Sequence, residues 1–420
     1  MTGARTPRVC VVRQFYFPRD IRVRREVDAL LAAGYEVDVV CLREPGERSS
    51  ERVGALTVRR LPMSHTRGGA FGYAGRYLIF LLIASWVVAL RHVRRRYDIV
   101  QVHSLPDLLV LVGVVPRLLG ARVLLDLHEV MPEFFATKFR RPPTHPLVRL
   151  VALAEQLSIR VSDHCLTCTE QMRETFVGRG APARKLTVVL NAADESVFDV
   201  RRFPPRPGPG FTLICHGTIE ERYGLDTVVD ALPELRRHIP GLLFQVYGEG
   251  TFRAQLVELA RVRGVSEVVQ VSDGLVPMSE LLEAISRADV GIVALKRDAF
   301  RDLTHCNKMY EYIALRLPVA SSRTRSVEAY FPDTALQYFE AGDAQDLTRA
   351  ILELHGDSRR REQLVQDATA VVEPYRWERQ REIYLLAVAG LLRPHRQAPA
   401  PTRRGAPVGV PASPSPEGPR

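Results

Sequence analysis

Short apolar segments alternate with helix-like segments along the whole chain, and this alternation limits the fold more than any other feature. The apolar segments lie at 8–12, 37–42, 98–103, 122–128, 164–169 and 186–191, and again at 211–217, 242–248, 268–274, 290–295, 318–322 and 335–339. Strands that are apolar on both faces and are joined by helical crossovers form parallel sheets covered by helices on both sides. The sequence therefore predicts an α/β protein.

A segment dense in proline and glycine, FPPRPGPGF at 203–211, divides the two groups of predicted strands. Such composition is typical of a linker. A chain of 420 residues is also too long for one ordinary core. The predicted organisation is a first domain over 1–200, a linker over 201–210, a second domain over 211–375, an amphipathic helix over 376–392 and a Pro- and Arg-rich, disordered tail over 393–420.

Positive charge is concentrated in the first half of the chain, where residues 1–200 hold 29 Lys and Arg against 20 Asp and Glu. No basic stripe with interleaved aromatic residues is visible, so we expect no nucleic-acid partner. An anionic membrane surface or a phosphate-bearing acceptor fits the charge better, and solvated surface arginines would explain it as well. The apolar run Leu78–Leu90 has 13 residues and precedes a basic cluster, RHVRRRY. It is short for a membrane span and predicts a buried or an interfacial helix.

Few cysteines, mostly inside apolar segments, and a start that runs directly into a predicted strand favour a cytoplasmic protein, with the inner face of the membrane as an open alternative. Cys165 and Cys168 form a C-x-x-C pair, but no second pair follows it. We therefore expect no metal site.

Polar residues and glycines follow several of the predicted strands. Ligands of open α/β sheets bind beyond the carboxyl ends of the strands. The candidates at these ends include His103, His128, Glu129, Gly217 and Gly248. The segment HCNKMYEYIALRLPVASS (305–322) adds a helix start at Asn307, where free backbone N–H groups suit a phosphate.

Several segments, in their order and spacing, resemble the GT-B glycosyltransferases, and most closely the retaining family 4. They are FYFPRDIRVRREVDALLAAGYEVDVVCL (15–42), YDIVQVHSLPDLL (97–109), LLDLHEVMPEF (124–134), VVLNAADESVF (188–198), HGTIEERYGLDTVVDAL (216–232), VYGEG (246–250), ADVGIVAL (288–295) and NKMYEYIALRLPVAS (307–321). The resemblance implies two Rossmann-like domains facing a cleft, with the nucleotide sugar on the second domain and the acceptor on the first. It also implies that the helix over 376–392 crosses back to the first domain and that no metal or other cofactor is needed.

The resemblance further implies donor-binding roles for specific residues. Gly217 and Gly248 belong to turns that lie close to the nucleotide, and Asn307 and Lys308 lie against the sugar and the diphosphate. Glu311 matches a glutamate that accepts hydrogen bonds from the ribose hydroxyls.

Three departures from the family pattern are visible. Thr218 and Tyr223 stand where the family usually has a phosphate-binding Arg and Lys, so Arg222 is the candidate substitute. Leu303 replaces the first glutamate of the family's pair, which leaves Asp302 and Thr304 as alternative sugar contacts.

On the acceptor side, the resemblance assigns catalytic roles to residues at the ends of two predicted strands. His103 would lie at the donor sugar, and His128 and Glu129 would bind or deprotonate an acceptor hydroxyl.

The expected activity is the retaining, metal-independent transfer of a hexosyl group from a UDP- or GDP-linked sugar to a hydroxyl of a glycan or lipid-linked glycan. Cell-envelope or exopolysaccharide synthesis is the expected setting. The alternatives are a GT-B nucleotide-sugar epimerase and a catalytically degenerate GT-B scaffold protein. A dinucleotide-dependent oxidoreductase is disfavoured, because no complete G-x-G-x-x-G follows a predicted strand.

Overall fold

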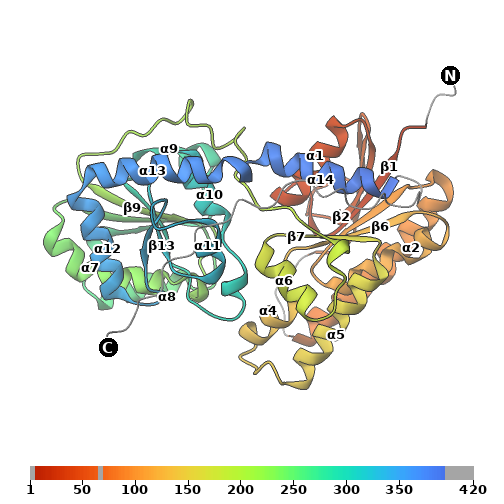
Figure 1. Cartoon of the computed structure of the whole chain (residues 1–420), viewed down its shortest axis with the longest axis horizontal. Coiled ribbons are helices and arrows are strands. Elements are labelled where there is room, and N and C mark those ends of the chain that lie inside the picture. Colours follow the sequence, from red (N-terminus) through yellow and green to blue (C-terminus); the bar gives the residue numbers. More distant parts are fainter. Residues whose placement is uncertain (1–4, 65–69, 393–420) are drawn as a thin grey trace, which may run out of the picture.

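The computed structural model describes residues 5–64 and 70–392 and consists of two α/β halves that lie side by side (Figure 1). Each half contains one sheet with helices on both of its faces. The first half is coloured red to yellow in Figure 1, and the second is coloured green to blue. The predicted α/β class and the two parallel sheets are confirmed.

The sheet of the first half has eight strands in the order β3-β4-β2-β1-β5-β6-β7-β8. Their bounds are Arg8–Tyr16 (β1), Glu36–Leu42 (β2), Ser50–Val53 (β3), Leu56–Leu61 (β4), Ile99–His103 (β5), Arg122–Leu127 (β6), His164–Thr167 (β7) and Leu186–Val188 (β8). The strand β1 pairs in parallel with both β2 and β5, and only β3 runs antiparallel to its neighbour. The carboxyl ends of β5, β6 and β7 therefore meet at one edge.

The sheet of the second half has six parallel strands in the order β11-β10-β9-β12-β13-β14. Their bounds are Phe211–His216 (β9), Leu242–Tyr247 (β10), Val269–Val271 (β11), Val290–Val293 (β12), Val319–Ser322 (β13) and Gln337–Phe339 (β14). Every strand predicted from the apolar segments is found, with bounds that differ by a few residues. The hairpin β3–β4 was not predicted, because all of β3 is exposed and carries no apolar run.

Two groups of helices cover the two faces of the first sheet. The first face is covered by α2 (Ala70–Arg95), η1 (Asp107–Gly113), α3 (Val114–Leu118), α5 (Pro146–Val161) and α6 (Glu170–Gly178), and α4 (Met131–Lys138) precedes α5. The second face is covered by α1 (Ile21–Ala32) and α14 (Trp377–Leu392). The side chain of Tyr384 on α14 is fully buried in the core beside α1. The last helix of the chain thus packs on the first sheet, as Figure 1 shows.

The second sheet is covered in the same way. One face carries α7 (Leu225–His238), α8 (Arg253–Val262) and α12 (Ala344–Gly356), and the other carries α9 (Met278–Arg287), α10 (Asn307–Ala314) and α11 (Arg325–Tyr330), while α13 (Ser358–Val372) contributes to both cores. Short 3-10 turns complete the chain at η2 (Ala183–Lys185), η3 (Glu221–Tyr223), η4 (Ser266–Val268), η5 (Arg301–Leu303) and η6 (Glu373–Tyr375). The prediction of a disordered tail concerns residues 393–420, which lie outside the described residues.

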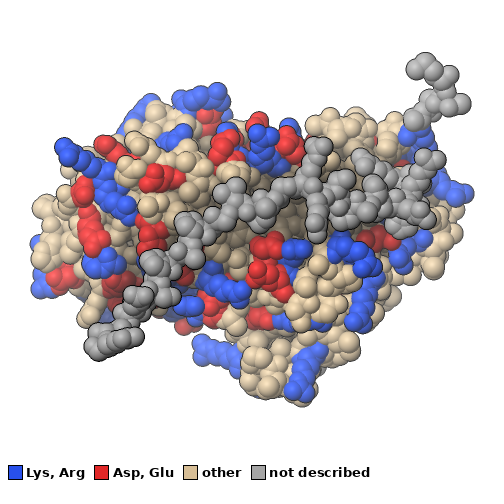
Figure 2. Space-filling model, viewed as in Figure 1, with Lys and Arg blue, Asp and Glu red and all other residues tan. Residues whose placement is uncertain are grey.

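Direct bonds join the two halves beside the edge where the strands of the first sheet end. The hydroxyl of Thr169 donates to the carbonyl of Leu303 at 2.6 Å, and the backbone N–H of Glu170 donates to the hydroxyl of Tyr330 at 2.8 Å. At the opposite side of the junction, Arg376 forms a bidentate ion pair with Glu195. The carboxyl edges of the two sheets are thereby held facing each other. In the view of Figure 2, acidic and basic side chains mix over the second half, whereas the lobe of α4 and α5 is tan and blue.

Candidate active site

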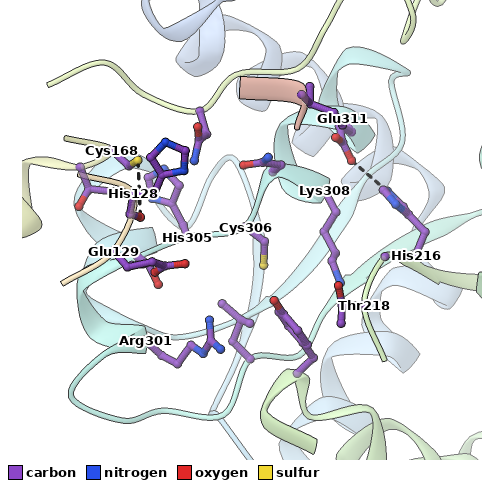
Figure 3. A pocket seen from close by; sticks show the side chains of 18 of the residues that line it. His128, Glu129, Cys168, His216, Thr218, Arg301, His305, Cys306, Lys308 and Glu311 are labelled. Carbon is purple, nitrogen blue, oxygen red and sulfur yellow. Dashed lines mark hydrogen bonds and ion pairs between the residues drawn. The ribbon is translucent and has the colours of Figure 1, made fainter. Parts of the chain in front are cut away.

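A cavity of about 490 Å³ lies between the two halves, at the carboxyl edges of both sheets. A volume of this size is ordinary for a small-molecule site. The first half contributes Ile21, His128, Glu129, Cys168, Thr169, Asn191 and Phe198, and the second contributes His216, Gly217, Thr218, Tyr223, Met278, Leu281, Leu295, Arg301, Thr304, His305, Cys306, Asn307, Lys308 and Glu311. Figure 3 shows that charged groups from both halves point into this space. The structure brings together six of the predicted site residues here.

The amino end of α10 opens into the cavity, at the position the sequence predicted for a phosphate. Its N-cap residue, Cys306, makes no side-chain capping bond to the helix. The first N–H groups of a helix have no partners within the helix, and they carry partial positive charge. The preceding loop is fixed by His305, whose ring nitrogens bond with Tyr310 at 2.8 Å and Ser326 at 3.1 Å. The uncapped helix end is therefore a rigid, preformed site for an anion.

Lys308 lies on the first turn of α10, and its ammonium group sits at the floor of the cavity. The side chain is 8% exposed, and Nζ lies 3.5 Å from the thiol of Cys215 and 5.0 Å from the ring centroid of Tyr223. None of these neighbours is a carboxylate. Gly217 lies alongside, and a Cβ at that position would be 4.0 Å from the same nitrogen. The buried cation thus lies directly beside the glycine turn, and both line the cavity.

Gly248 supports this turn without lining the cavity. A Cβ at Gly248 would lie 1.8 Å from the carbonyl oxygen of Gly217, so no other residue fits there. The N–H of Gly217 donates to the carbonyl of Tyr247 at 2.8 Å. Gly248 therefore shapes the turn after β9, and the direct nucleotide contact implied by the resemblance stays a prediction.

Glu311 lies one turn further along α10 and faces His216 from β9. The distance between His216 Nε2 and Glu311 Oε2 is 3.3 Å (Figure 3). Burial raises the pKa of Glu311 to about 7, while Lys308 and Arg25 lower it. Burial together with Lys308 lowers the pKa of His216 to about 3, so this imidazole is neutral at pH 7. Among the described residues, no cation contacts the Glu311 carboxylate, which therefore retains the capacity to accept hydrogen bonds from a ligand.

Arg301, on η5, is a cavity residue that the sequence analysis missed. It is 7% exposed, and its guanidinium lies 4.9 Å from the ring centroid of Phe300 and 5.1 Å from that of Tyr223. Its Nε is buried and has no hydrogen-bond partner in the described part of the chain. No motif spacing marks Arg301; the only signal in the sequence is a cation directly after an aromatic residue, shortly before the start of α10.

Arg222, the predicted substitute for the family's phosphate-binding cations, lines a different cavity. This second cavity of about 480 Å³ lies next to the first, and Arg301 is common to both walls. The Nε of Arg222 is also buried without a partner among the described residues. The η3 turn that carries Arg222 ends at Gly224, whose φ is +66° and whose Cβ position is blocked by the carbonyl of Ala294.

The first half of the cleft presents His128 and Glu129, which directly follow β6. Burial raises the pKa of Glu129 to about 7, although Arg301 and Arg222 from the opposite half lower it. Burial lowers the pKa of His128 to about 4, although Asp126 raises it. At neutral pH the cavity therefore holds a neutral imidazole beside a carboxyl group that is close to half ionised. Both groups can exchange a proton with a bound hydroxyl.

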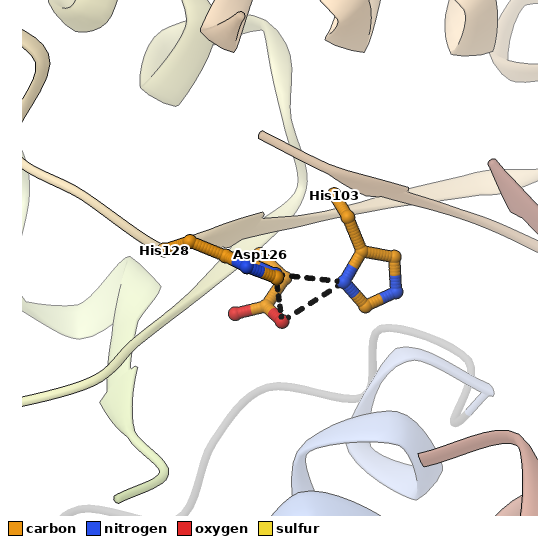
Figure 4. Close-up of side chains that lie close together, drawn as sticks. All are labelled: His103, Asp126 and His128. Atoms are coloured by element: carbon orange, nitrogen blue, oxygen red, sulfur yellow. Dashed lines mark hydrogen bonds and ion pairs between the residues drawn. The ribbon is translucent and has the colours of Figure 1, made fainter. Parts of the chain in front are cut away.

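His103 does not line the cavity but lies behind His128, with no exposed surface. Its Nδ1 is 3.1 Å from Asp126 Oδ2, and Nε2 of His128 is 3.2 Å from the same oxygen (Figure 4). Arg22 donates two further bonds to this carboxylate, at 2.7 and 2.8 Å. Burial opposes ionisation, but Arg22 and the imidazoles outweigh it and hold the pKa of Asp126 well below its usual range. The ionised carboxylate thus accepts from both imidazoles, which places a proton on His103 Nδ1 and on His128 Nε2.

The network extends from His103 to the last helix of the chain. Gln101 on β5 lies 3.1 Å from His103 Nε2, and this nitrogen accepts the amide proton because Nδ1 carries the imidazole proton. The hydroxyl of Tyr384 on α14 donates to Gln101 Oε1 at 2.7 Å. The polar residues Gln101 and Asp126 interrupt otherwise apolar strands, and that interruption is the sequence signal that marks this network.

His103, Asp126 and His128 also form a group whose ligand atoms lie close enough together to hold a metal ion. The arrangement is better explained by hydrogen bonding, since the shared atom, Asp126 Oδ2, already accepts from Arg22 Nε at 2.7 Å. A second cation bound to that atom would lie beside the guanidinium.

Two facing parallel sheets, with an anion site on one wall and proton-exchanging groups on the other, define a GT-B transferase architecture. Residues 20–192 match the Glycosyl transferase 4-like domain family, and residues 210–357 match Glycosyl transferases group 1. The chain belongs to the family 4-like glycosyltransferases of the GT-B fold.

Solved structures and curated sequences agree with this family. The sucrose-phosphate synthase of Thermosynechococcus elongatus is similar with a TM-score of 0.73 at 17% identity, over 91% of this chain and 100% of that one. A trehalose-6-phosphate structure from E. coli, bound with UDP-2-fluoro glucose, has a TM-score of 0.69 at 12% identity, over 92% and 99%. At such identities the likeness concerns the fold.

Among curated sequences, the glycogen synthase of Mycobacterium tuberculosis is 30% identical over 37% of this chain and 37% of its own length. A GDP-mannose-dependent alpha-(1-6)-phosphatidylinositol monomannoside mannosyltransferase of Mycolicibacterium smegmatis is 29% identical over 39% of this chain and 46% of its own length. The matched region thus spans less than half the length of each of these relatives.

Proposed function

We propose that this protein transfers a hexosyl group from a nucleoside diphosphate sugar to a hydroxyl of a glycan or lipid-linked glycan, with retention of the anomeric configuration. The observation that carries this proposal is the uncapped amino end of α10, which opens into the cleft with Lys308 on its first turn and Glu311 on its next. A helix end and a buried cation suit a diphosphate, and a carboxylate suits the ribose diol.

The donor diphosphate would lie between the turn at Gly217 and the amino end of α10. Lys308 and the helix N–H groups would stabilise the charge that develops on the leaving phosphate, without the help of a metal. Arg301 supplies the second cation, and it takes the place that Arg222 was expected to occupy. Its planar guanidinium, held between two aromatic rings, has a free buried Nε to donate. Both cations are desolvated, so each interacts strongly with a bound phosphate.

Retention is explained by a front-face reaction in which the acceptor attacks from the side that the leaving group vacates. The bond between the anomeric carbon and the diphosphate oxygen breaks, and the bond to the acceptor oxygen forms on the same face. The acceptor proton passes to the departing phosphate oxygen, so the products are the glycoside and the nucleoside diphosphate. The chain must then supply charge stabilisation and orientation more than a strong base.

His128 and Glu129 would orient the acceptor hydroxyl, and Glu129 would receive its hydrogen bond when ionised. His103 has a different role from the direct sugar contact expected of it. It holds the Asp126 carboxylate that fixes the proton on His128 Nε2. We therefore treat His103 as a positioning residue, and His128 and Glu129 as the catalytic candidates.

The test is calorimetric titration of the protein with UDP, GDP, ADP and TDP, followed by the same titrations of Glu311→Ala. The first two choices are supported by a similar structure from Anabaena, which is in complex with UDP, and by the mycobacterial mannosyltransferase, which is GDP-mannose-dependent. We expect one nucleotide to bind the wild type and to lose about tenfold or more in affinity in the variant. Absence of binding by every nucleotide would reject the donor site and favour a scaffold protein.

Once the nucleotide is known, its sugar conjugates can be offered with glycan and lipid-linked acceptors, and the anomeric configuration of the product can be read by proton NMR. Product of inverted configuration would reject the front-face reaction. Turnover of the sugar nucleotide to an epimer without acceptor would indicate an epimerase. We further propose that the enzyme works in cell-envelope or exopolysaccharide synthesis, at the cytoplasmic face of the membrane, because an acceptor that carries a lipid is confined to that surface.

A further inference from the structure

Three helical segments of the first half expose apolar side chains on their outward sides. We call this surface, formed by α2, η1–α3 and α5, the three-helix face. Its apolar members are Leu78, Ile79, Leu82, Trp86, Leu90 and Val93 from α2, Leu111, Val115, Leu118 and Leu119 from the η1–α3 segment, and Leu147, Leu150, Leu153 and Leu157 from α5. Their exposed fractions run from 36% to 81%. Soluble proteins rarely expose an apolar patch formed by several neighbouring elements.

These side chains form one surface because the three segments share one core. The inner sides of α2, η1 and α5 place Phe80, Leu109 and Ile159 in the same buried cluster on one face of the first sheet. The η1 segment contacts both α2 and α5. On α2 the exposed residues recur every four positions, from Leu78 to Leu90, so they lie along one side of the helix. The three outward sides therefore point away from the sheet together.

The surroundings of the three-helix face are basic. Exposed arginines flank its apolar side chains at positions 94, 96, 141, 149 and 160. Within residues 75–96, 107–121 and 138–162 the acidic residues are Asp107 and Glu155, and both are buried. Part of this distribution is visible in Figure 2, where the lobe of α4 and α5 is tan and blue. A surface with apolar ridges, a cationic rim and no exposed carboxylate in these stretches complements an anionic lipid surface.

We propose that the three-helix face docks on the surface of an anionic lipid bilayer and holds the enzyme there. Two copies of this chain would bring two cationic rims together, so a second copy is a poorer partner. One helix, over Gly75–Arg95, is long and apolar enough to cross a membrane. It lies along the sheet instead, because Phe80, Ala84 and Val88 are fully buried, and Arg91 and Arg95 pair with Asp38 at 3.0 and 2.6 Å. The geometry fits a helix lying in the plane of the interface.

This docking would orient the cleft toward the lipid. The connection between α4 and α5 borders the three-helix face. Lys138 at the end of α4 and Arg140 in this connection line the second cavity together with Arg222 and Arg301. The second cavity thus leads from the end of α4 to the active site through Arg301, and its six Lys and Arg side chains outnumber the carboxylates of Glu220, Glu221 and Asp298. If the proposed function holds, a lipid-linked acceptor with an anionic head group would reach His128 and Glu129 along this path. The docking itself requires no sugar nucleotide.

The experiment is co-sedimentation of the protein with vesicles of phosphatidylcholine containing about one third phosphatidylglycerol, against vesicles of pure phosphatidylcholine. We expect binding to the anionic vesicles, weakened by salt but not abolished, since both charge and apolar contacts contribute. The changes Trp86→Glu and Leu153→Glu should each lower the partition coefficient about tenfold. The matched control is Val262→Glu, an equally exposed apolar residue of the second half at 61% exposure, which should bind as the wild type does.

The charge contribution is tested by changing Arg94, Arg149 and Arg160 together to Glu, which should remove most binding to the anionic vesicles. Its control changes three arginines of the second half with 65% to 69% exposed side chains, Arg237, Arg261 and Arg287, in the same way. Equal loss in both triple variants would indicate net charge alone and overturn the proposal. So would wild-type sedimentation that Trp86→Glu leaves unchanged.

The fluorescence of Trp86 also reports directly on contact with lipid, since this side chain is 72% exposed and the chain has two tryptophans. In a Trp377→Phe background its emission should shift to the blue on anionic vesicles and be quenched by brominated lipid. A blue shift that grows with protein concentration without vesicles, together with a dimer in analytical ultracentrifugation, would assign the face to self-association and reject the proposal. Calorimetric nucleotide binding, measured without lipid, is unaffected by either outcome, so the docking and the proposed function fail separately.

Discussion

The two walls of the cleft differ in how far their polar groups are satisfied. On the first half, the carboxylate of Asp126 receives bonds from Arg22, His103 and His128, and the network continues through Gln101 to Tyr384. On the second half, the buried Nε of Arg301 in the cleft and the buried Nε of Arg222 in the neighbouring cavity have no hydrogen-bond partners among the described residues. The Asp126 carboxylate is thus bonded within the protein, whereas these two cations each keep a buried nitrogen that can still donate.

The difference indicates which wall of the cleft provides the binding energy for a ligand. Buried polar groups without partners cost free energy, and a native chain keeps them where a ligand or a solvent molecule completes them. A pre-bonded wall, by contrast, fixes the tautomer and the direction of His128 before any substrate arrives. Changes to the first wall should therefore act mainly on the free energy of unfolding and on the orientation of His128. Changes to the second wall should act mainly on donor binding.

The largest effect on folding is expected from Asp126→Ala. This change removes the bidentate partner of buried Arg22 and leaves Glu26, 3.3 Å away, as its remaining carboxyl neighbour; breaking a buried ion pair costs about 3–5 kcal/mol of unfolding free energy. Urea denaturation measures the loss. The control Asp230→Ala removes an exposed pair with Arg263 and should cost less than about 1 kcal/mol. Equal losses in both variants would mean that the Asp126 network does not stabilise the first wall.

The largest effect on catalysis is expected from changes to the two buried cations of the second wall. Lys308→Ala and Arg301→Ala should each lower kcat/KM about 100-fold or more, as removal of a preorganised charge at a leaving group does. Neither cation is in ion-pair contact with a carboxylate of the described residues, although Lys308 lowers the pKa of Glu311 and Arg301 that of Glu129, so the unfolding free energy should fall less than in Asp126→Ala. The exposed Arg287→Ala serves as the control and should keep wild-type kinetics. If Lys308→Ala and Arg301→Ala lost unfolding free energy as strongly as Asp126→Ala does, the proposed difference between the two walls would be contradicted.

The pKa of Glu311 allows a test of the second wall through pH. Because burial raises this pKa to about 7, the folded protein binds a proton more tightly than the unfolded chain, so Glu311 costs stability as the pH rises from about 4.5 through about 7. At pH 8, Glu311→Gln should therefore raise the unfolding free energy by about 3 kcal/mol, and the gain should vanish near pH 4.5. The midpoint of thermal unfolding of both proteins, measured between pH 4.5 and pH 8, reports this difference in stability.

The same substitution should weaken nucleotide binding, because the ionised carboxylate accepts hydrogen bonds that an amide accepts less strongly. Wild-type affinity should fall as the pH drops below about 7, and the affinity of Glu311→Gln should lose that dependence. A variant that is both less stable at pH 8 and unimpaired in binding would show that Glu311 is a structural residue.

Much of the fold could be predicted from the sequence, because strands buried on both faces must be apolar throughout. The hairpin β3–β4 escaped this rule, since β3 is exposed along its full length. The uncapped end of α10 was predictable as well, since a helix start and a cation adjoin in NKMYEY. The role of Arg301 was not, because its position depends on how η5 folds against Tyr223 and Phe300.

His103 illustrates the same limit on the first wall. Its place at the carboxyl end of β5 was predicted, but the sequence does not state that His128 lies between it and the cavity. That order depends on the register of β5 and β6, which pairs His103 with Asp126. Side-chain contacts between strands far apart in the chain are set by register, and register is set by the packing of the whole sheet.

The smallest predicted effect concerns Tyr384, at the end of the Asp126 network that is most distant from the cavity. Tyr384→Phe removes the bond to Gln101 Oε1 and leaves the buried ring in place, so the unfolding free energy should fall by about 1 kcal/mol. If the network orients His128, kcat should fall a few-fold with KM for the donor unchanged, because Tyr384 does not line the cavity. The control Tyr247→Phe changes a half-buried tyrosine of β10 and should leave kcat unaltered. A change in donor KM without a change in kcat would show that Tyr384 acts through the closure of the two halves and not through His128.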